Sequence, residues 1–322
     1  MLDVYFTVDV ELWCNGWKNL DAKFKKAFDK HILGITKKGN FGLPYKLKVL
    51  NDYGLKGVFF VEPLFSLRFG VDPLAEIIGM ILEANQSVEL HMHTEWVDEI
   101  NDPRMFKVKK KLQHIRYFTP DEQNKLIEIG KKLLIQTGVE KIHAFRAGSF
   151  GFNLHTLSAL QKNNIYIDSS YNASLLGPSS GFMPGQIITS PIKYNKVVEV
   201  PMTVYTDWPG HLKHAQLCSC LSDELEGLLK KYLEEGRKDV VILSHSFELL
   251  DKLRKRPSPI VIKRFHKLCE FLDKNRDYYT TKWFSDFSFD GNSEQLPPIK
   301  SNVINTGKRY FEQIVSRYKV IK

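Results

Sequence analysis

Short runs of apolar residues alternate along the chain with segments in which an apolar residue recurs at every third or fourth position. The apolar runs predict buried strands and the segments with helical spacing predict amphipathic helices. Strands are predicted within residues 4–10, 57–63, 88–96, 141–151, 165–172, 197–205 and 239–248. Helices are predicted at residues 43–54, 73–85, 119–138, 153–164, 221–236 and 258–275. This regular alternation predicts an α/β fold with a parallel sheet.

The segment 119–138 carries the strongest boundary signals of any predicted helix. Thr119 is expected to be the N-cap, Pro120 the first helical residue and Glu122 an acidic residue of the first turn. Gly138 ends the helix. These residue types favour the two ends of a helix for reasons of hydrogen bonding and charge.

Neither an internal repeat nor a low-complexity tract divides the chain, so one domain is expected over residues 1–289. A peripheral C-terminal tail follows at 290–322, with a short helix predicted at 309–318. Residues 12–42, rich in Lys, Gly and Asn, predict a long excursion before the first regular helix. Residues 173–193, rich in Gly, Ser and Pro, predict a loop or lid.

Composition narrows the class of protein. Hydrophobic residues make up 43% of the 322 positions and aromatic residues 12%, which is enough for a packed core. The sequence contains no run of eighteen apolar residues, and its N-terminus lacks the pattern of a secretory signal. Four scattered cysteines do not form a disulfide framework. We therefore expect a cytoplasmic protein that contacts a membrane at most at its surface.

The formal net charge of +9 favours anionic partners such as an acidic glycan, a phospholipid or a nucleic acid. Basic residues cluster at 23–26, 107–111 and 254–256, although such clusters are usually solvated surfaces. Neither a glycine-rich phosphate loop nor a zinc-finger spacing accompanies them. Nucleic-acid binding is therefore not expected.

The stretch "VELHMHTEW" places three polar side chains at alternating positions of an apolar run. His91, His93 and Glu95 would share one face of a strand, where they are either metal ligands or a wetted sheet edge. Other predicted strands also end in charged residues, which are Asp9 and Glu11, Arg146, Asp168 and His245. The carboxyl ends of parallel strands lie on one face, and charges gathered there are costly unless they compensate one another or bind a metal.

Asp9 and Glu11 lie two positions apart, so both carboxylates are expected on the same side of their strand. A cation held by Glu11 and His91, with His93 or Glu95 completing the set, would offset their repulsion. Nitrogen and oxygen ligands suit Zn²⁺ or a similar divalent ion. In the alternative interpretation Asp9 is a turn residue and Glu11 forms a salt bridge with Arg146.

Five short motifs occur in the order found in the polysaccharide deacetylase family, also called the NodB-homology or carbohydrate esterase 4 family. The segments that resemble its motifs are "FTVDVE" (6–11), "SVELHMHTE" (87–95), "FRAGSFG" (145–151), "IDSS" (167–170) and "ILSH" (242–245). The resemblance covers roughly residues 1–285. It looks closest to a subgroup associated with lipopolysaccharide O-antigen loci, the WalW- and WbmS-like proteins.

The resemblance implies an irregular (β/α)7 barrel and a metal-dependent hydrolase that removes an N-acetyl or other N-acyl group from a sugar. Asp9 would be the general base, and Arg146 would hold it. His245 would be the general acid, with Asp168 as its partner. The metal, expected to be Zn²⁺, would be bound by Glu11, His91, His93 and Glu95.

Two departures from the family pattern bear on the metal site. The family commonly has adjacent aspartates in its first motif, whereas Val10 follows Asp9 here, which moves the ligand to Glu11. It usually has histidines four residues apart in the second motif, whereas Glu95 stands four after His91. Either Glu95 replaces a histidine ligand or His93 does, and a third alternative is a degenerate protein that binds glycans without hydrolysing them.

The substrate implied by the resemblance is an N-acylated sugar or polysaccharide precursor in the synthesis of lipopolysaccharide or another surface polysaccharide. Trp13, Trp96 and Trp208 are expected to stack on sugar rings, although aromatic residues also serve as packing. Ser149 and Phe150, from the arginine motif, are expected to contact the substrate. A basic protein associated with nucleic acid is the remaining alternative.

Overall fold

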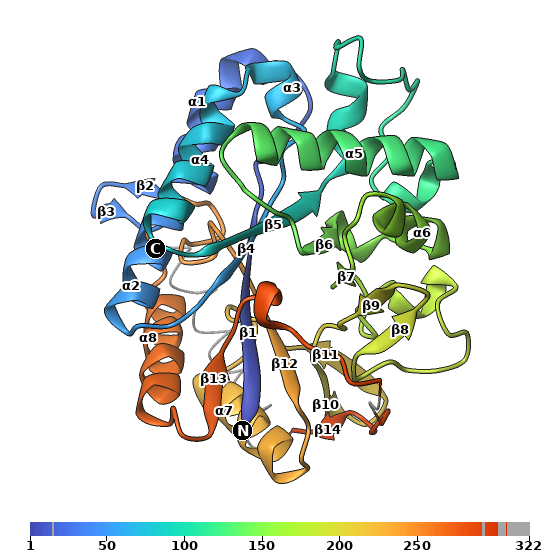
Figure 1. Cartoon of the computed structure of the whole chain (residues 1–322). Helices are drawn as coiled ribbons and strands as arrows, with labels where there is room; N and C mark the ends of the chain where they lie inside the picture. The colour runs from blue at the N-terminus through green and yellow to red at the C-terminus, as the bar shows by residue number, and fades with distance from the viewer. Residues whose placement is uncertain (15, 292–293, 302–306, 308–322) are drawn as a thin grey trace.

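The computed structural model describes residues 1–14, 16–291, 294–301 and 307. Its main sheet has the strand order β12-β1-β4-β5-β6-β7-β9-β8, and β13 also pairs with β1. The sheet curls into a half-closed barrel, in which β1 lies between β12 and β4 (Figure 1). Its strands are β1 (Leu2–Val10), β4 (Val58–Val61), β5 (Ser87–Met92), β6 (Ala144–Ala147), β7 (Ile167–Asp168), β8 (Ile192–Tyr194), β9 (Val197–Glu199), β12 (Asp239–His245) and β13 (Tyr279–Thr281).

Every pairing from β12 to β9 is parallel, and only β8 runs antiparallel to its neighbour. Strand β1 is buried along almost its whole length, as expected for a parallel strand covered on both faces. Its register places Asp9 beside His245 on β12. On the far side of β4, His91 is paired with Arg146. The register therefore brings together the residues predicted to form the site.

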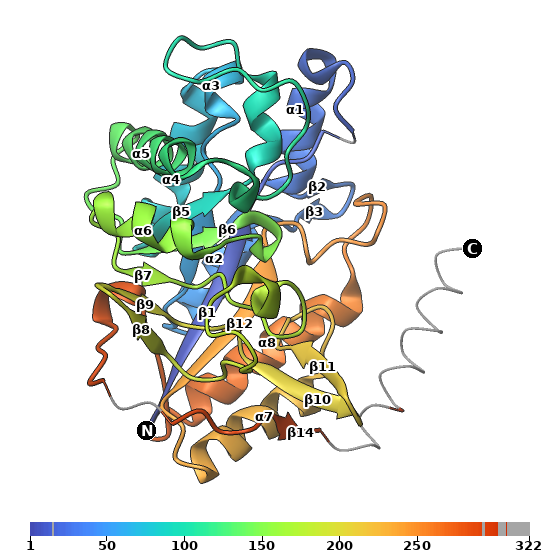
Figure 2. The same ribbon diagram turned by 90° about the vertical axis from the view of Figure 1, so that its right-hand side faces the viewer.

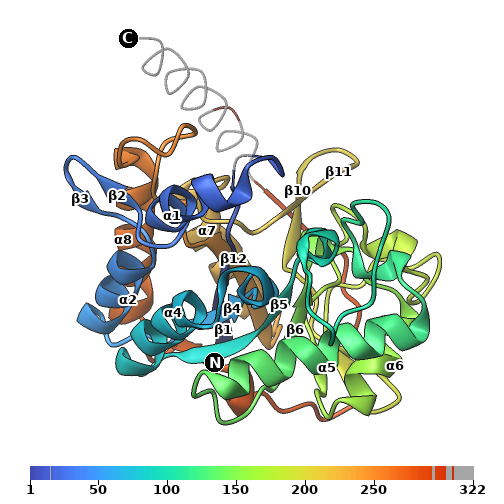
Figure 3. The same cartoon turned by 90° about the horizontal axis from the view of Figure 1, so that it is seen from above.

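Helices surround the outside of this sheet, as the view from above shows (Figure 3). They are α1 (Leu20–His31), α2 (Leu43–Asp52), α3 (Ser66–Phe69), α4 (Asp72–Glu83), α5 (Pro120–Gln136), α6 (Leu154–Lys162), α7 (Ser222–Glu234) and α8 (Pro259–Lys274). Short 3₁₀ helices are η1 (Thr94–Glu99), η2 (Ile115–Tyr117), η3 (Gly148–Phe150), η4 (Gly177–Ser180) and η5 (Phe284–Asp286). Helix α5 begins with the predicted cap, in which Thr119 and Glu122 bond to each other's backbone N–H.

The opening between β9 and β12 is bridged by irregular chain. The N–H of Ala215 donates to the carbonyl of Thr203, and the N–H of Leu243 on β12 donates to the carbonyl of Ala215. A smaller sheet lies beside this bridge (Figure 2). It consists of β10 (Val204–Trp208), β11 (His211–His214) and β14 (Ile299–Lys300), while β2 (Ile35–Thr36) and β3 (Gly39–Asn40) pair separately.

Three sequence-based predictions differ from the structure. The excursion predicted for residues 12–42 contains helix α1, whose apolar residues Leu20, Ala27 and Phe28 pack into the core. The strand predicted for 197–205 is divided into β9 and β10. The strand predicted for 88–96 ends at Met92, and Glu95 lies in the turn η1.

The division of the chain at residue 289 stays a prediction. Residues 299 and 300 form β14 and pair with β10, and Gln295 accepts hydrogen bonds from the backbone N–H groups of Thr189 and Ser190. The helix predicted for 309–318 lies outside the described residues. All four cysteines are free thiols. Within the described part of the chain, each helix is too short or too polar to cross a bilayer.

Candidate active site

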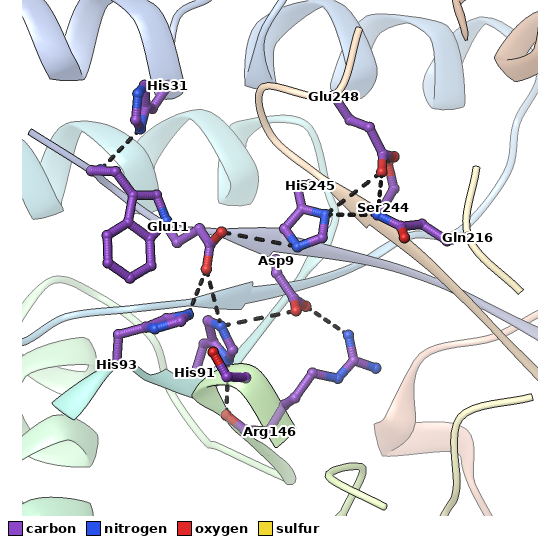
Figure 4. A network of polar contacts seen from close by, with 12 residues as sticks. Asp9, Glu11, His31, His91, His93, Arg146, Gln216, Ser244, His245 and Glu248 are labelled. Atoms are coloured by element: carbon purple, nitrogen blue, oxygen red, sulfur yellow. Dashed lines mark hydrogen bonds and ion pairs between the residues drawn. The ribbon is translucent and has the colours of Figure 1, made fainter. Parts of the chain in front are cut away.

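The candidate site lies where the ends of β1, β5, β6 and β12 meet (Figure 4). It combines the predicted residues Asp9, Glu11, His91, His93, Arg146 and His245. Except for His245, whose side chain is 22% exposed, these residues are at most 7% exposed. Burial removes these charges from water, so each must be balanced by a neighbour or by a bound ion.

Glu11, His91 and His93 form a compact set of ligand atoms. Glu11 Oε2 lies 2.5 Å from His93 Nε2 and 3.6 Å from His91 Nε2. One ligand atom from each of the three residues lies within 4.8 Å of the other two. Two ligands of one tetrahedral zinc ion are about 3.4 Å apart, given bonds of about 2.0–2.2 Å. The set therefore has the dimensions of a metal site.

The hydrogen bonding of His91 supports a metal rather than a proton at this place. His91 Nδ1 donates to the backbone carbonyl of Arg146 at 2.8 Å, so in the neutral ring Nε2 carries the lone pair. Nε2 is buried and has no hydrogen-bond partner among the described residues. A buried acceptor without a donor is costly, and an outward Nδ1–H bond to a carbonyl is the usual support of a histidine ligand. The residues present therefore fit a divalent ion such as Zn²⁺.

His93, rather than Glu95, faces Glu11. Because the chain leaves the strand at Met92, Glu95 lies on the opposite side of the His93 ring, with its Oε2 3.3 Å from His93 Nδ1. Burial alone would lower the pKa of His93, but Glu11 and Glu95 raise it well above its usual value. Burial alone would raise the pKa of Glu11, but His93, His91 and His245 lower it well below its usual value.

Asp9 is held by the fully buried Arg146. Arg146 Nη1 donates to Asp9 Oδ1 at 2.6 Å and to Thr7 Oγ1 at 2.9 Å. Its Nε donates to the carbonyl of Ser169, and the guanidinium lies 4.2 Å from the ring centre of Phe60. Arg146 thus pairs with Asp9, and the alternative salt bridge to Glu11 is not formed. The second oxygen of Asp9 lies 3.9 Å from His91 Nε2, beside the candidate metal position.

The carboxylate that faces His245 is Glu248. Glu248 Oε1 lies 3.6 Å from His245 Nδ1, while His245 Nε2 points towards Glu11 Oε1 at 3.9 Å. Gln216 and Ser244 donate to the two oxygens of Glu248 at 2.6 and 2.7 Å, and the fully buried Lys46 donates to Ser244 Oγ at 2.7 Å.

This environment shifts the pKa of both members of the pair. Burial would lower the pKa of His245, but the hydrogen bond that it donates to Glu248 and the charges of Glu11, Glu248 and Asp9 raise it to about 9. Burial would raise the pKa of Glu248, but His245 and Lys46 lower it to about 2. Sequence reasoning missed Glu248, although its position three residues after His245 was a usable signal.

Asp168 contacts another carboxyl group instead of His245. It pairs in register with Glu199 on the neighbouring strand, and both side chains are fully buried. Ser170 Oγ donates to Asp168 Oδ1 at 2.6 Å, and the N–H of Tyr171 donates to Glu199 Oε1 at 2.9 Å. Burial raises the pKa of Asp168 to about 6, and burial together with Asp168 raises that of Glu199 further. Both shifts favour the protonated carboxyl, as expected when two carboxyl groups are buried side by side.

The predicted substrate tryptophans lie in different surroundings. The ring of Trp13 meets the His93 ring edge-on, with centres 4.7 Å apart. Trp96 is only 1% exposed and packs against Trp17, Phe65 and Phe69, so its ring belongs to the core. Trp208 is 47% exposed at the end of β10.

Ser149 and Phe150 lie in the turn that follows Arg146. Both have a left-handed backbone, with φ of 50° and 59°, which side-chain-bearing residues adopt rarely. Gly148 before them has no room for a side chain, because a Cβ there would lie 2.6 Å from the carbonyl oxygen of Met92 and 2.8 Å from His93 Nδ1. The turn is therefore packed directly against the His93 ring.

The structure of the chain is similar to several solved structures, and these similarities concern the fold. No protein-family model and no curated protein matches the chain. The structure is similar to that of a candidate polysaccharide deacetylase from Mycobacterium smegmatis, with a TM-score of 0.53 and 16% identity over 88% of this chain and 87% of the other. A 4-alpha-glucanotransferase from Thermococcus litoralis matches with a TM-score of 0.50 and 10% identity, over 94% of this chain and 42% of the other. A family 4 carbohydrate esterase from Streptomyces lividans, in complex with acetate, matches with a TM-score of 0.41 and 9% identity, over 88% and 91% of the two chains.

The similarity to the protein from Mycobacterium smegmatis and the strand order of the sheet confirm the predicted fold, an irregular (β/α)7 barrel of the polysaccharide deacetylase type. Deacetylases and esterases of carbohydrates are among the structural neighbours. The similarity to the O-antigen-associated subgroup stays a prediction.

The Asp168–Glu199 pair predicts an unusual dependence of stability on pH. Because the folded chain holds protons that the unfolded chain releases above about pH 4–5, the pair costs stability increasingly as the pH rises through the folded pKa values. Glu199→Gln can still accept the hydrogen bond from the N–H of Tyr171 but has no titrating proton. We expect its free energy of unfolding, relative to that of the wild type, to increase by roughly 1–3 kcal/mol between pH 5 and pH 8.

Urea denaturation of both proteins at the two pH values measures this difference. Glu76→Gln, on the exposed side of α4, controls for the loss of one carboxyl group. An equal effect of Glu199→Gln at pH 5 and pH 8 would show that the pair does not hold an extra proton.

Proposed function

We propose that the chain is a metal-dependent hydrolase that removes an N-acetyl or other N-acyl group from a sugar during the synthesis of lipopolysaccharide or another surface polysaccharide. The observation that carries this proposal is the buried, unpartnered Nε2 of His91, which faces Glu11 and lies next to the Asp9–Arg146 pair. The similarity of the fold to that of a candidate polysaccharide deacetylase supports it. The cytoplasmic location stays a prediction.

Glu11, His91 and His93 would hold the ion, for which Zn²⁺ is the first choice because of the two imidazoles and one carboxylate. When bound, a divalent ion would polarise the acyl carbonyl and acidify a water molecule. Glu11 and His93 now share a direct hydrogen bond of 2.5 Å, so ion binding must release the proton between them.

Asp9 is placed to act as the general base. Its Oδ1 is occupied by Arg146, whereas its Oδ2 points towards the ligand set and is available to accept a proton from the attacking water. Arg146 is itself immobilised by Thr7 and Ser169, so the carboxylate is oriented before substrate binds.

His245 is placed to act as the general acid on the opposite side of Glu11. Its Nε2 faces the site, and its Nδ1 faces Glu248. As the C–N bond of the amide breaks, Nε2 would give its proton to the departing sugar amine while the acyl carbon keeps the oxygen of water. Glu248 takes the role that the family resemblance gives to Asp168, namely to fix the tautomer and orientation of the histidine ring.

The test is acetate release from N-acetylated oligosaccharides by the purified protein after incubation with Zn²⁺. We expect release that is lost on chelation and restored by the ion, and we expect Asp9→Asn to lower kcat by about 10²-fold or more. Asp29→Asn, on helix α1, is the matched control and should keep full activity. A zinc-loaded protein that binds these sugars without releasing acetate would instead support a degenerate glycan-binding protein.

The position of Glu248 predicts a reversal of the roles implied by the family resemblance. Glu248→Gln should lower kcat by about 10²-fold with little change in KM, because it disturbs a proton transfer and not the binding of the sugar. Asp168→Asn keeps a hydrogen-bonding partner for Glu199 and should have kcat near that of the wild type. A large loss of kcat in Asp168→Asn with full activity in Glu248→Gln would contradict this assignment.

A further inference from the structure

Arg254 is a cation without a carboxylate partner at the edge of the candidate site. It lies in the loop between β12 and α8, half-buried, and no carboxylate comes within ion-pair distance of its guanidinium among the described residues. Its contacts are instead with two rings. The guanidinium lies 3.9 Å from the ring centre of Phe247 and against the imidazole of His31.

These two rings connect Arg254 to the residues of the site. The ring of Phe247 is stacked on that of His245, with centres 5.4 Å apart, and is equally far from the ring of His31. His31 Nδ1 accepts a hydrogen bond of 2.9 Å from the backbone N–H of Trp13, the residue whose ring meets His93. Figure 4 shows His31 on the same side of the network as Glu11.

His31 does not neutralise the charge of Arg254. A neutral imidazole offers the Arg254 guanidinium a hydrogen-bond acceptor but no negative charge. Burial and the charge of Arg254 lower the pKa of His31 to about 3, so the ring stays neutral. Arg254 also adopts a left-handed backbone with φ of 52°, which costs energy in a residue other than glycine. Burial lowers the pKa of Arg254 and the charge of Glu11 raises it, so Glu11 partly balances this cation from beyond ion-pair distance. The chain therefore holds, in a strained backbone conformation, a cation that has no ion-pair partner among the described residues.

Further cations gather beside Arg254. Burial together with the charges of Lys26 on α1 and of Lys255 and Arg254 in the loop lowers the pKa of Lys30 on α1. Asp251 is the acid that partly offsets this effect. Like charges from two elements thus meet at one rim, which becomes favourable when an anion lies between them.

We propose that Arg254 binds an anionic group of the substrate, a carboxylate or a phosphate, and that Lys30 and Lys255 line the path by which this group enters. The inference rests on the proposed function, since it places the anion on the sugar that reaches Glu11, His91 and His93. A guanidinium binds either anion through two parallel hydrogen bonds, which a lysine cannot form. The substrate is accordingly an acidic N-acyl sugar or one that carries a phosphate ester.

The experiment compares the binding of three matched probes by calorimetry. They are a neutral N-acetylated disaccharide, the corresponding disaccharide with a uronic acid in place of one neutral sugar, and a nucleoside diphosphate N-acetyl sugar. We expect the wild-type protein to bind one anionic probe at least about tenfold more tightly than the neutral one. The preferred probe distinguishes a carboxylate from a phosphate.

Arg254→Ala should weaken binding of that probe by about 10- to 100-fold and leave binding of the neutral disaccharide unchanged. Arg254→Lys keeps the charge but not the paired hydrogen bonds, so its affinity for the anionic probe should lie between those of the wild type and of Arg254→Ala. Arg256→Ala is the matched control, because Arg256 is an exposed cation of the same loop. Equal affinity for all three probes, no binding of either anionic probe, or equal weakening of neutral and anionic probes by Arg254→Ala would each overturn the proposal.

Binding is measured without turnover, so the two proposals fail in different ways. The protein could prefer an anionic probe through Arg254 and yet release no acyl group. That result would contradict the proposed hydrolase activity and support the anion site. Acyl release from neutral and anionic substrates with equal kcat/KM would contradict the anion site and support the proposed hydrolase activity.

Discussion

The hydrogen bond from His91 Nδ1 to the backbone carbonyl of Arg146 determines what the centre of this barrel can do. It joins β5 to β6 at their carboxyl ends and turns the other ring nitrogen, Nε2, towards Glu11. The side chain of the same arginine holds Asp9 on β1. One residue thus orients a candidate metal ligand through its backbone and the candidate base through its guanidinium, so the two parts of the site cannot shift independently.

The buried charges around this centre are balanced in pairs. Asp9 is paired with Arg146 and Glu248 with His245, whereas burial and mutual repulsion raise the pKa of both Asp168 and Glu199. His91 Nε2 is the one atom of the ligand set without a partner in the described part of the chain. Removing one partner of a buried ion pair typically costs about 3–5 kcal/mol, because the other charge is left buried without compensation. Proteins keep costly arrangements of this kind mainly at functional sites.

The alternation of apolar runs with helical segments was sufficient to predict an α/β fold with a parallel sheet and charged residues gathered at its strand ends. The irregular (β/α)7 barrel was predicted from the resemblance of the five motifs to the polysaccharide deacetylase family. In a parallel sheet the register then brings Asp9 beside His245 and His91 beside Arg146. Helix α1 was missed because its exposed lysines hide a short apolar face. The position of Glu95 was predicted wrongly because side chains alternate between the two faces only within the strand, which ends at Met92.

Other features depend on contacts that strand periodicity does not encode. Glu248 reaches His245 only because the chain turns directly after β12. Asp168 meets Glu199 because β9, and not a strand bearing a histidine, is the next neighbour of β7. Both arrangements are determined by loop conformation and by strand order, which single motifs do not reveal.

The measurement that tests the account most directly is the anomalous scattering of zinc in crystals of the protein soaked with the ion. The account predicts one buried peak about 2.0–2.3 Å from Glu11 Oε, His91 Nε2 and His93 Nε2, with the His91 Nδ1–Arg146 hydrogen bond retained. A site that remains empty with Glu11 and His93 still in direct contact, or a peak held by Glu95 away from His91, would contradict it.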